Sequence, residues 1–231
     1  MSFNELITKL NELNIDLDDK QKEQLLLYKE FLIKYNEHTN LTSITDEEGI
    51  YLKHFYDSLT ITKEIVLDNQ KVLDIGTGAG FPGLVLKIVY PNLDITLLDS
   101  NNKKIKFLDE LTKLLNIKVT LVNKRAEEYV SDNRESYDLV VSRAVANLNT
   151  LLELSIPYLK VNGYFIAMKS NIEEELNKCH NELKVLNSKI ININEFKLIN
   201  DDKRTLIKIM KIDKTDNKYP RRYDKIIKSP L

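Results

Sequence analysis

The stretch VLDIGTGAGFPGL, residues Val72–Leu84, decides the fold of this chain. An apolar strand ends at Ile75, and glycines occupy every second position from Gly76 to Gly80 before a helix-like segment begins. A strand that runs directly into a glycine-rich turn and a helix N-terminus lets a nucleoside approach the backbone, because no Cβ blocks it and free N–H groups face it. The pattern therefore predicts a binding site for a nucleotide-like molecule.

Two kinds of cofactor could use such a turn. The segment Gly78–Gly83 satisfies the G-x-G-x-x-G pattern of dinucleotide sites, but that match alone is weak. Counted from the strand end, Asp74 opens the pattern D-x-G-x-G-x-G, which is typical of S-adenosylmethionine methyltransferases. A carboxylate here suits a cofactor with a sulfonium and an α-amino group, whereas it would repel a pyrophosphate. The spacing favours S-adenosylmethionine, with Gly76 and Gly78 as binding residues, over a dinucleotide or an ordinary turn with surplus glycine.

A second candidate cofactor-binding residue lies at the end of the next predicted strand, Asp94–Asp99. Its last residue, Asp99, is an acid 19 residues beyond Gly80. That distance is expected for a carboxylate that accepts hydrogen bonds from both ribose hydroxyls. We therefore predict that Asp99 binds ribose. The alternative is that Asp99 or Ser100 only caps the helix that follows.

From Lys71 onward, strand-like runs alternate with helix-like runs, which predicts a parallel sheet with helices on both faces. Two β-branched runs then follow, Ile190–Leu198 and Thr205–Ile212, and the junction between them contains Asn200 and Asp201. Such a junction predicts a hairpin, which is typical of the methyltransferase variant of the Rossmann architecture. The other expected strands are Val72–Ile75, Asp94–Asp99, Lys118–Asn123, Tyr137–Ser142 and Tyr164–Lys169, and the expected helices are Phe81–Tyr90, Lys103–Leu115, Leu148–Leu159 and Ile172–Leu186.

The fold class expected is thus α/β, a class I S-adenosylmethionine methyltransferase sheet that is mostly parallel with an antiparallel C-terminal hairpin. Residues 1–66 show apolar residues at helical spacing, so we expect an N-terminal helical appendage there. Residues 67–231 would form the methyltransferase domain with a basic C-terminal tail. A chain of 231 residues has room for one α/β domain with a small addition.

Composition restricts the class of protein further. Hydrophobic residues make up 42% and charged residues 30% of the chain, as in globular proteins, and no apolar run is long enough to span a bilayer. The N-terminus lacks the basic start and apolar centre of a secretion signal. The single cysteine, Cys179, excludes an intramolecular disulfide and has no His or Cys at metal-ligand spacing. We expect a cytoplasmic, metal-free protein without a membrane segment.

The charge is uneven along the chain, although the net charge is only −1. Residues 203–228 hold 10 Lys or Arg and 3 Asp. A tail that carries Arg221, Arg222 and Lys225 among tyrosines could follow phosphates and stack on bases. A solvated terminal tail explains the same residues equally well.

At this point the chain resembles one family over nearly its whole length, the bacterial 16S ribosomal RNA guanine-N7 methyltransferases, or glucose-inhibited division protein B family. In two places it departs from the common family pattern: Ser170 stands where glycine is common, and Tyr223–Ile227 lacks a G-x-P step. The segments that carry the resemblance are YNEHTNLTSI (Tyr35–Ile44), KHFYDSL (Lys53–Leu59), LDIGTGAGFPG (Leu73–Gly83), LLDSNNKKIKFL (Leu97–Leu108), RAEE (Arg125–Glu128), SRAVANL (Ser142–Leu148), AMKS (Ala167–Ser170) and YPRRYDKIIKSPL (Tyr219–Leu231).

This resemblance implies S-adenosylmethionine as the cofactor and 16S ribosomal RNA, in the region of the 530 loop, as the substrate, either free or in the small ribosomal subunit. A monomer is expected. The implied cofactor contacts are Gly76, Phe81, Ala126, Glu127 and Arg143, and the residues assigned to RNA are Arg221, Arg222, Lys225 and Lys169.

The residues themselves agree with several of these assignments. Glu127 follows a strand end, where an acid or a backbone group can contact the edge of adenine. The alternative is that RAEE is only the start of a surface helix, where acids are also common. Arg143 ends the strand Tyr137–Ser142 at the edge where ligands of open α/β sheets bind, so we expect it to be functional rather than only paired structurally. His54 and Asp57 are expected to join the appendage to the sheet.

Methylation of guanine N7 needs no general base, because the lone pair that attacks carries no proton. Catalysis would rest on positioning and electrostatics. Arg143 could position guanine O6, a phosphate or the cofactor carboxylate, but it cannot occupy N7 in the reactive pose. Two other functions stay open: a methyltransferase that acts on a small molecule, and a non-catalytic module that senses a nucleotide.

Overall fold

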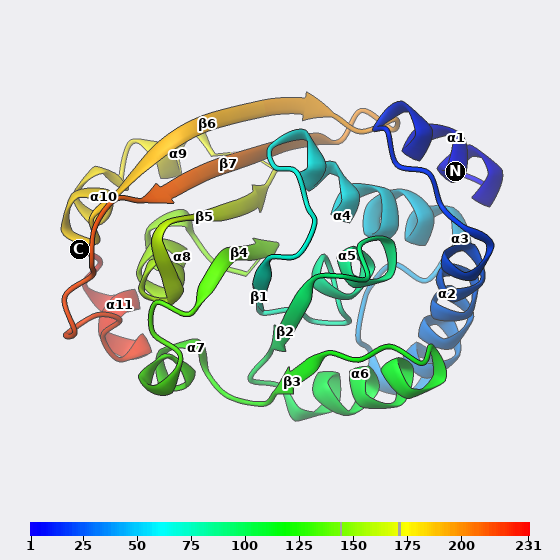
Figure 1. The fold of residues 1–231 in the computed structure, drawn as a ribbon, viewed down its shortest axis with the longest axis horizontal. Coiled ribbons are helices and arrows are strands. Elements are labelled where there is room, and N and C mark those ends of the chain that lie inside the picture. Colours follow the sequence, from blue (N-terminus) through cyan, green and yellow to red (C-terminus); the bar gives the residue numbers. More distant parts are fainter. Residues whose placement is uncertain (144, 171) are drawn as a thin grey trace.

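The computed structural model describes residues 1–143, 145–170 and 172–231, and within them a seven-stranded sheet runs through the centre (Figure 1). The strand order is β3-β2-β1-β4-β5-β7-β6, in which the first five strands are parallel and the last two form an antiparallel hairpin against β5. This confirms the fold class expected from the sequence. The strands are β1 (Lys71–Ile75), β2 (Asp94–Leu98), β3 (Thr120–Val122), β4 (Tyr137–Arg143), β5 (Leu159–Lys169), β6 (Ser188–Lys197) and β7 (Lys203–Lys211).

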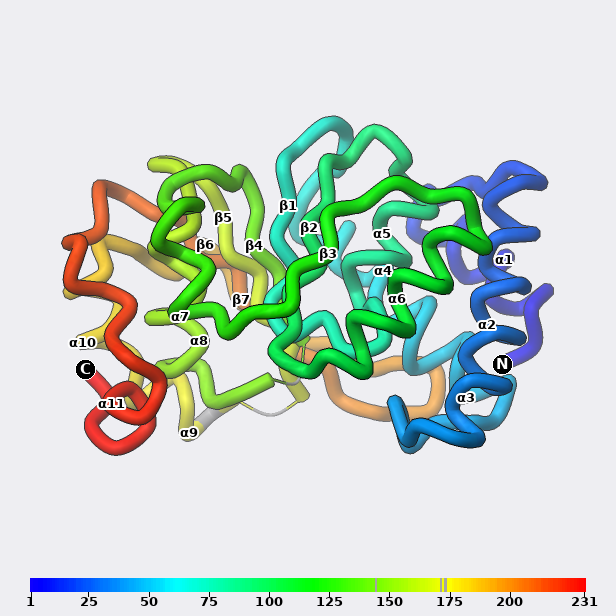
Figure 2. Tube along the Cα trace, turned by 90° about the horizontal axis from the view of Figure 1, so that it is seen from below, coloured from blue at the N-terminus to red at the C-terminus, as the bar shows by residue number. Residues whose placement is uncertain are grey.

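Helices connect the parallel strands, and helices joined by short loops make up the chain before β1. The N- and C-termini lie at opposite ends of the molecule, as Figure 2 shows. None of the helices among the described residues has the length and apolar character needed to cross a membrane. The helices are α1 (Phe3–Glu12), α2 (Asp19–Thr39), α3 (Glu47–Gly49), the π-helix η1 (Ile50–Tyr56), α4 (Asp57–Leu59), η2 (Thr60–Lys63), α5 (Gly83–Val89), α6 (Asn102–Leu114), α7 (Ala126–Tyr129), η3 (Val130–Asp132), α8 (Leu148–Ser155), η4 (Ile156–Tyr158), α9 (Glu173–Leu176), α10 (His180–Val185) and α11 (Tyr223–Lys228).

Two hydrophobic clusters hold the helices to the sheet. In the first, Leu25 of α2 and Phe55 of η1 belong to the same buried cluster as Leu84 of α5 and Phe107 of α6. The second joins α8, β5 and α11 and includes Ile226 of the tail. Because the N-terminal helices share their core with helices of the sheet domain, the division of the chain at residue 66 stays a prediction.

Several expected elements differ from those observed. The first crossover helix begins at Gly83, two residues later than Phe81, because the Gly83 N–H bonds to the buried Asp74 side chain while Phe81 packs against the N-terminal helices. The helix expected over Ile172–Leu186 is instead two short helices, α9 and α10. They are separated at Cys179, which is fully buried and whose N–H reaches back to the carbonyl of Leu176. The tail, expected to be solvated or bound to RNA, ends in helix α11.

The π-helix η1 is a feature that the sequence pattern did not predict. A π turn is wider than an α-helical turn and is frequent at functional sites. Here the carbonyl of Lys53 and the side chain of His54 in η1, together with Asp57 of α4 that follows, face Arg143 at the end of β4. The local winding therefore brings the N-terminal helices to the carboxyl edge of the sheet.

Candidate functional site

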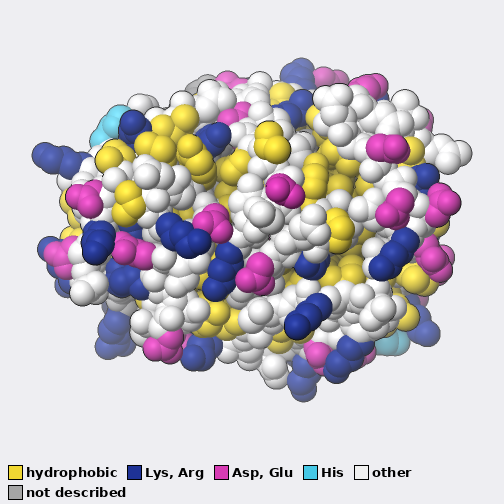
Figure 3. Space-filling view, viewed as in Figure 1, with side chains coloured by type: hydrophobic (Ala, Val, Ile, Leu, Met, Phe, Trp, Pro, Cys, Tyr) yellow, Lys and Arg dark blue, Asp and Glu magenta, His cyan; other side chains and the backbone are white. Residues whose placement is uncertain are grey.

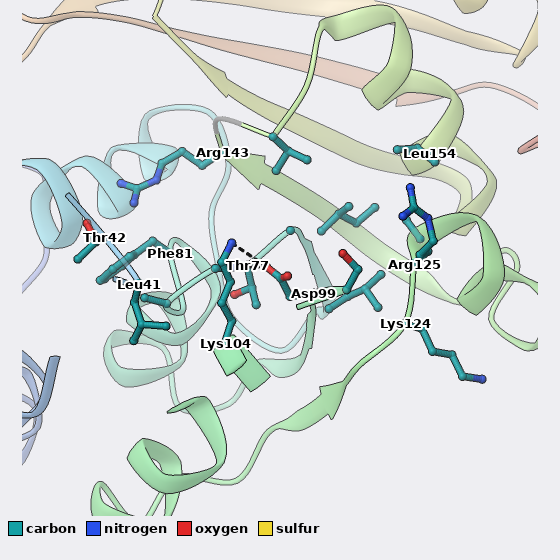
Figure 4. A pocket seen from close by; sticks show the side chains of 18 of the residues that line it. Leu41, Thr42, Thr77, Phe81, Asp99, Lys104, Lys124, Arg125, Arg143 and Leu154 are labelled. Atoms are coloured by element: carbon teal, nitrogen blue, oxygen red, sulfur yellow. Dashed lines mark hydrogen bonds and ion pairs between the residues drawn. The ribbon is translucent and has the colours of Figure 1, made fainter. Parts of the chain in front are cut away.

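A cavity of about 430 Å³ opens at the carboxyl edge of β1, β2 and β4, and we call it the strand-end cavity. Figure 4 shows Arg143, Thr42 and Phe81 at one end of it, Arg125 and Leu154 at the other, and Asp99 between them. The edge position follows from the topology, because parallel strands end together and the first β-strand lies beside both β2 and β4. The seven residues predicted to contact the cofactor all line it: Gly76, Gly78, Phe81, Asp99, Ala126, Glu127 and Arg143.

The glycines of the turn after β1 serve two different purposes. Gly76 and Gly78 have φ of +70° and +61°, a backbone region that other residues rarely adopt. A Cβ on Gly76 would lie 2.5 Å from Cγ2 of Val145, so this position is closed by packing. A Cβ on Gly78 would meet nothing nearer than 3.9 Å. Nothing crowds Gly78, so a ligand can approach the backbone there.

The acid of the turn motif, Asp74, is fully buried and does not line the cavity. One carboxylate oxygen, Oδ2, accepts hydrogen bonds from Thr77 Oγ1 at 2.7 Å and from the Gly83 N–H at 2.8 Å. The other oxygen has no partner among the described residues. Burial raises the pKa of Asp74 to about 6. The carboxylate thus fastens the glycine turn to α5, and it does not face the cofactor as the charge argument from the sequence assumed.

Asp99 lies in the floor of the cavity and binds the same turn from the other side. Its Oδ2 accepts from the Gly78 N–H at 2.9 Å, and its Oδ1 accepts from the Asn101 N–H at 2.9 Å. Lys104 Nζ lies 3.5 Å from Oδ2. The N-cap of α6 is Asn101 and neither Asp99 nor Ser100, so the capping alternative is wrong. Each carboxylate oxygen has two lone pairs, which leaves acceptor capacity for ligand hydroxyls.

One end of the cavity contains the start of α7 and, from far along the chain, the C-terminal helix. The Glu127 carboxylate accepts from Arg125 Nε at 2.7 Å. The Arg125 guanidinium lies over the ring of Tyr223, 4.5 Å from its centre. Tyr223 therefore belongs to the cavity wall. The tail that the sequence associated with RNA also reaches the predicted cofactor site.

Arg143 stands at the other end and is held by groups of the N-terminal helices. Its Nη1 donates to the Lys53 carbonyl at 2.7 Å and to Asp57 Oδ2 at 3.2 Å, and its Nη2 donates to His54 Nδ1 at 3.2 Å. It also lies over the ring of Phe81 at 5.2 Å. Arg143 is therefore paired structurally and also lines the predicted cofactor site. A structural role and a functional role for this residue do not exclude each other.

His54 is a neutral, oriented imidazole in this arrangement. Burial and the nearby Arg143 lower the pKa of His54 to about 3. Because an arginine can only donate, His54 Nδ1 must accept, and the proton then sits on Nε2, 3.0 Å from Thr42 Oγ1. The ring stacks on Phe81 with 4.2 Å between ring centres. His54 thus does more than join the appendage to the sheet, because it also lines the cavity.

The loop after α2 is fixed to the same wall by an asparagine. Asn36 Nδ2 donates to the Thr42 carbonyl at 2.9 Å, and Asn36 Oδ1 accepts from the Thr42 N–H at 3.0 Å. This pair of hydrogen bonds explains the spacing of Asn and Thr in the segment YNEHTNLT. Sequence reasoning did not place Thr42 in the site, although that segment carried part of the family resemblance.

The four residues assigned to RNA fall into two groups. Arg221 donates from its backbone N and from Nε to Glu153 Oε1, both at 2.8 Å, and Glu153 is buried. Lys169 Nζ donates to the Ala146 carbonyl at 2.6 Å and lies 2.8 Å from a carboxylate oxygen of Glu175. The side chain of Arg222 is 89% exposed, and Lys225 is exposed as well. Only Arg222 and Lys225 project into solvent, and the role of all four in RNA binding stays a prediction.

The surface shows no broad field of one charge on the face drawn in Figure 3, where basic and acidic side chains are interspersed. This agrees with the net charge of −1. Any attraction for a polyanion must therefore come from local groups. Those nearest the strand-end cavity are Lys104, Lys124 and Arg125, which line it and which sequence reasoning did not single out.

Comparison with known proteins supports one family. A family model described as rRNA small subunit methyltransferase G, or GidB, matches residues 21–206. The chain is 48% identical to the ribosomal RNA small subunit methyltransferase G of Staphylococcus carnosus, over 98% of this chain and 97% of that protein. It is 45% identical to the protein of the same name from Streptococcus gordonii over the full length of both.

Solved structures resemble the chain in fold. A SAM-dependent methyltransferase from Aquifex aeolicus matches with a TM-score of 0.59 at 15% identity, over 75% of this chain and 98% of that one. TYW2 of M. jannaschii in complex with AdoMet matches with a TM-score of 0.57 at 15% identity, over 74% of this chain and 80% of that one. At 15% identity these matches show that the fold is shared over most of the chain.

Proposed function

The chain belongs to the rRNA small subunit methyltransferase G family, and on that basis we propose that it transfers a methyl group from S-adenosylmethionine to N7 of a guanine in 16S ribosomal RNA. One observation carries the proposal: the similarity to this family extends over the full length of the chain and so spans every segment that lines the strand-end cavity. The enzyme is thus an S-adenosylmethionine-dependent ribosomal RNA methyltransferase.

The strand-end cavity fits S-adenosylmethionine. Its volume of about 430 Å³ lies within the range of about 300–1,000 Å³ that is usual for small-molecule sites. The uncrowded backbone at Gly78 admits a ligand, and Asp99 offers carboxylate oxygens to the ribose hydroxyls. Leu154 and Ala126 offer apolar contacts to adenine beside the polar Arg125 and Glu127. We assign the cofactor contacts to Gly76, Gly78, Phe81, Asp99, Ala126, Glu127 and Arg143.

When bound, S-adenosylmethionine supplies an electrophilic methyl group on a sulfonium. Guanine N7 presents a lone pair without a proton, so the protein does not have to remove one. The neutral His54 agrees with this, because its Nδ1 lone pair is engaged by Arg143 and its low pKa makes it a poor base. The chain's contribution is therefore to place the base and to hold an electrostatic environment around the transfer.

The substrate must present its guanine outside a regular helix. In A-form RNA the major groove is deep and narrow and hides N7, so the base has to lie in a loop or be turned out of the stack. We place the target guanine in the 530-loop region, as the family resemblance implies. The exposed Arg222 and Lys225 would contact phosphates near the site. We further propose that the protein acts as a monomer in the cytoplasm, where small ribosomal subunits are available.

The test is to map N7-methylguanine in 16S ribosomal RNA from cells with and without this gene. We expect one modified guanine that disappears without the gene and returns when the purified protein and S-adenosylmethionine are added to small subunits or to free RNA. Normal cofactor binding without methylation of ribosomal RNA would contradict the proposal. A methyl acceptor of another kind would then favour a small-molecule methyltransferase. If no acceptor is found, a module that senses a nucleotide is favoured.

A further inference from the structure

A second cavity adjoins the first on the side of the β6–β7 hairpin, and we call it the hairpin-side cavity. Its volume is about 610 Å³. His54, Arg143 and Val145 line both cavities and so form the boundary between them. A ligand in the hairpin-side cavity would therefore lie next to a cofactor in the strand-end cavity, and these three side chains of the described residues would contact both.

A buried carboxylate orders two arginines in the hairpin-side cavity. Asp57 is 3% exposed. Its Oδ2 accepts from Arg143 Nη1 at 3.2 Å, and its Oδ1 accepts from Arg204 Nε at 2.9 Å. Both arginines line the cavity, and they are distant in sequence: Arg143 is the last residue of β4 and Arg204 lies at the start of β7. Asp57 thus fixes the direction of two positive groups at once.

Each arginine keeps N–H groups for a ligand. Arg143 Nη1 donates its two hydrogens to the Lys53 carbonyl and to Asp57, and Nη2 donates one hydrogen to His54. The Nε hydrogen and the second Nη2 hydrogen have no acceptor among the described residues. Arg204 uses Nε on Asp57 and Nη1 on the Lys203 carbonyl, and no acceptor in the described part of the chain meets its Nη2. These donors call for a ligand that is rich in oxygen acceptors.

We propose that the hairpin-side cavity binds the guanosine nucleotide that is to be methylated, with O6 of the base on Arg143 and its phosphate on Arg204. The proposal rests on the proposed function. O6 and N7 lie side by side on the same edge of guanine. A base whose O6 contacts Arg143, at the boundary, therefore directs N7 into the strand-end cavity. The opposite placement would put an unreactive phosphate beside the methyl donor.

The rim of this cavity supplies a further cation for the RNA backbone. Lys53 Nζ lies 3.2 Å from Asp202 Oδ2, and each of the two side chains is 38% exposed. Such an exposed ion pair is weak, so a phosphate can replace Asp202 as the partner of Lys53. Neither Lys53 nor Arg204 lines the strand-end cavity, so substitutions of these residues remove no wall of the cofactor site.

The first experiment uses guanosine 5′-monophosphate as an inhibitor of methyl transfer to small ribosomal subunits. We expect inhibition that is competitive with the RNA and not with S-adenosylmethionine, and adenosine 5′-monophosphate should be at least tenfold weaker because adenine has an amino group where guanine has O6. Equal inhibition by the two nucleotides, or competition with the cofactor, would overturn the proposal.

The second experiment compares Arg204→Ala, Arg204→Lys and Lys53→Ala with wild type. We expect KM for the RNA to rise at least tenfold in Arg204→Ala and about threefold in Lys53→Ala, while the dissociation constant of S-adenosylmethionine from calorimetry changes less than twofold. Lys113→Ala, at an exposed position on α6, is the control. Lys53→Ala keeps the test valid if Arg204→Ala does not fold.

The two proposals fail differently. If wild-type protein methylates no guanine in either small subunits or free 16S ribosomal RNA, the proposed function is wrong. If wild type is active and the Arg204 and Lys53 variants keep the KM of wild type, only the assignment of the hairpin-side cavity is wrong.

Discussion

At one end of the strand-end cavity the side chain of Arg143 is 15% exposed and is held by Lys53, His54 and Asp57. At the other end the side chain of Arg125 is 46% exposed and is held by Glu127 and by the ring of Tyr223. Partners of a buried charge are costly to remove, whereas those of an exposed charge contribute little. The Arg143 end is therefore a fixed part of the fold, and the Arg125 end can adapt when ligands bind.

The strongest way to test this difference is Asp57→Ala. It leaves Arg143 and Arg204 without their shared buried carboxylate, so we expect a loss of about 3–5 kcal/mol in the free energy of unfolding, as is usual when one partner of a buried pair is removed. Urea unfolding measures it. The matched change at the other end, Glu127→Ala, should cost less than about 1 kcal/mol. Similar losses in the two variants would remove the distinction between the ends.

A second test asks whether the tail belongs to the fixed or the adaptable part. Arg221→Ala removes the guanidinium partner of the buried Glu153. We expect a loss of about 2–3 kcal/mol in stability, less than for Asp57→Ala, because the backbone N–H of residue 221 still donates to Glu153. Arg222→Ala, at an 89% exposed side chain, should leave stability unchanged and weaken RNA binding with a lower salt dependence. A thermal melt measures the stability of each variant, and a salt titration measures its RNA binding. If Arg221→Ala melts at the same temperature as wild type, the Arg221–Glu153 ion pair does not stabilise the fold.

The pH dependence of stability gives a third, smaller effect at the Arg143 end. The folded protein holds the pKa of His54 at about 3, below its ordinary value of 6.5, so the unfolded chain binds this proton more readily between those values. His54 therefore lowers the free energy of unfolding as pH falls below 6.5, by up to about 1.4 kcal/mol per pH unit. Asp74, whose pKa is raised from 3.8 to about 6, acts in the opposite direction as pH falls from 6 to 3.8.

For this reason the measurement compares wild type with His54→Gln from pH 7 to 4.5. The variant lacks only the His54 contribution, so wild type should lose stability relative to it as the pH falls. A difference between the two proteins that stays constant with pH would mean that His54 is not held neutral.

The smallest expected effect is at the adaptable end. Tyr223→Ala removes the ring beneath Arg125, and a cation–π contact at a partly exposed site contributes roughly 0.5–1 kcal/mol. We expect S-adenosylmethionine to bind about three- to fivefold more weakly by calorimetry, with the unfolding midpoint nearly unchanged. Tyr223→Phe keeps the ring and should bind as wild type does. Equal binding by Tyr223→Ala would show that the C-terminal helix does not contribute to cofactor affinity.

Local sequence patterns predicted the part of the site that is local in the chain. The glycine turn, Asp99 and Arg143 each follow a strand of the parallel sheet, and strand ends meet at one edge, so their proximity follows from topology. The pairing of Asp57 with Arg204 spans 147 residues, and that of Arg221 with Glu153 spans 68. No periodicity or spacing connects such residues, so these pairs could not be predicted.

Asp74 shows that side-chain contacts could not be predicted even within one motif. Its position in the motif was correct, but the side chain points away from the cavity toward the Gly83 N–H, which depends on how α5 packs against β1. The direction of a side chain at a strand end is decided by the elements on both faces of the sheet.

The sequence by itself determined the sheet, the glycine turn and the class of cofactor, because these depend on the alternation of strand-like and helix-like runs, on residues that tolerate positive φ, and on strand ends that share an edge. Only the tertiary structure decided which cations are engaged and which are free. That outcome depends on burial, since a buried Asp57 or Glu153 requires a partner wherever in the chain the partner lies.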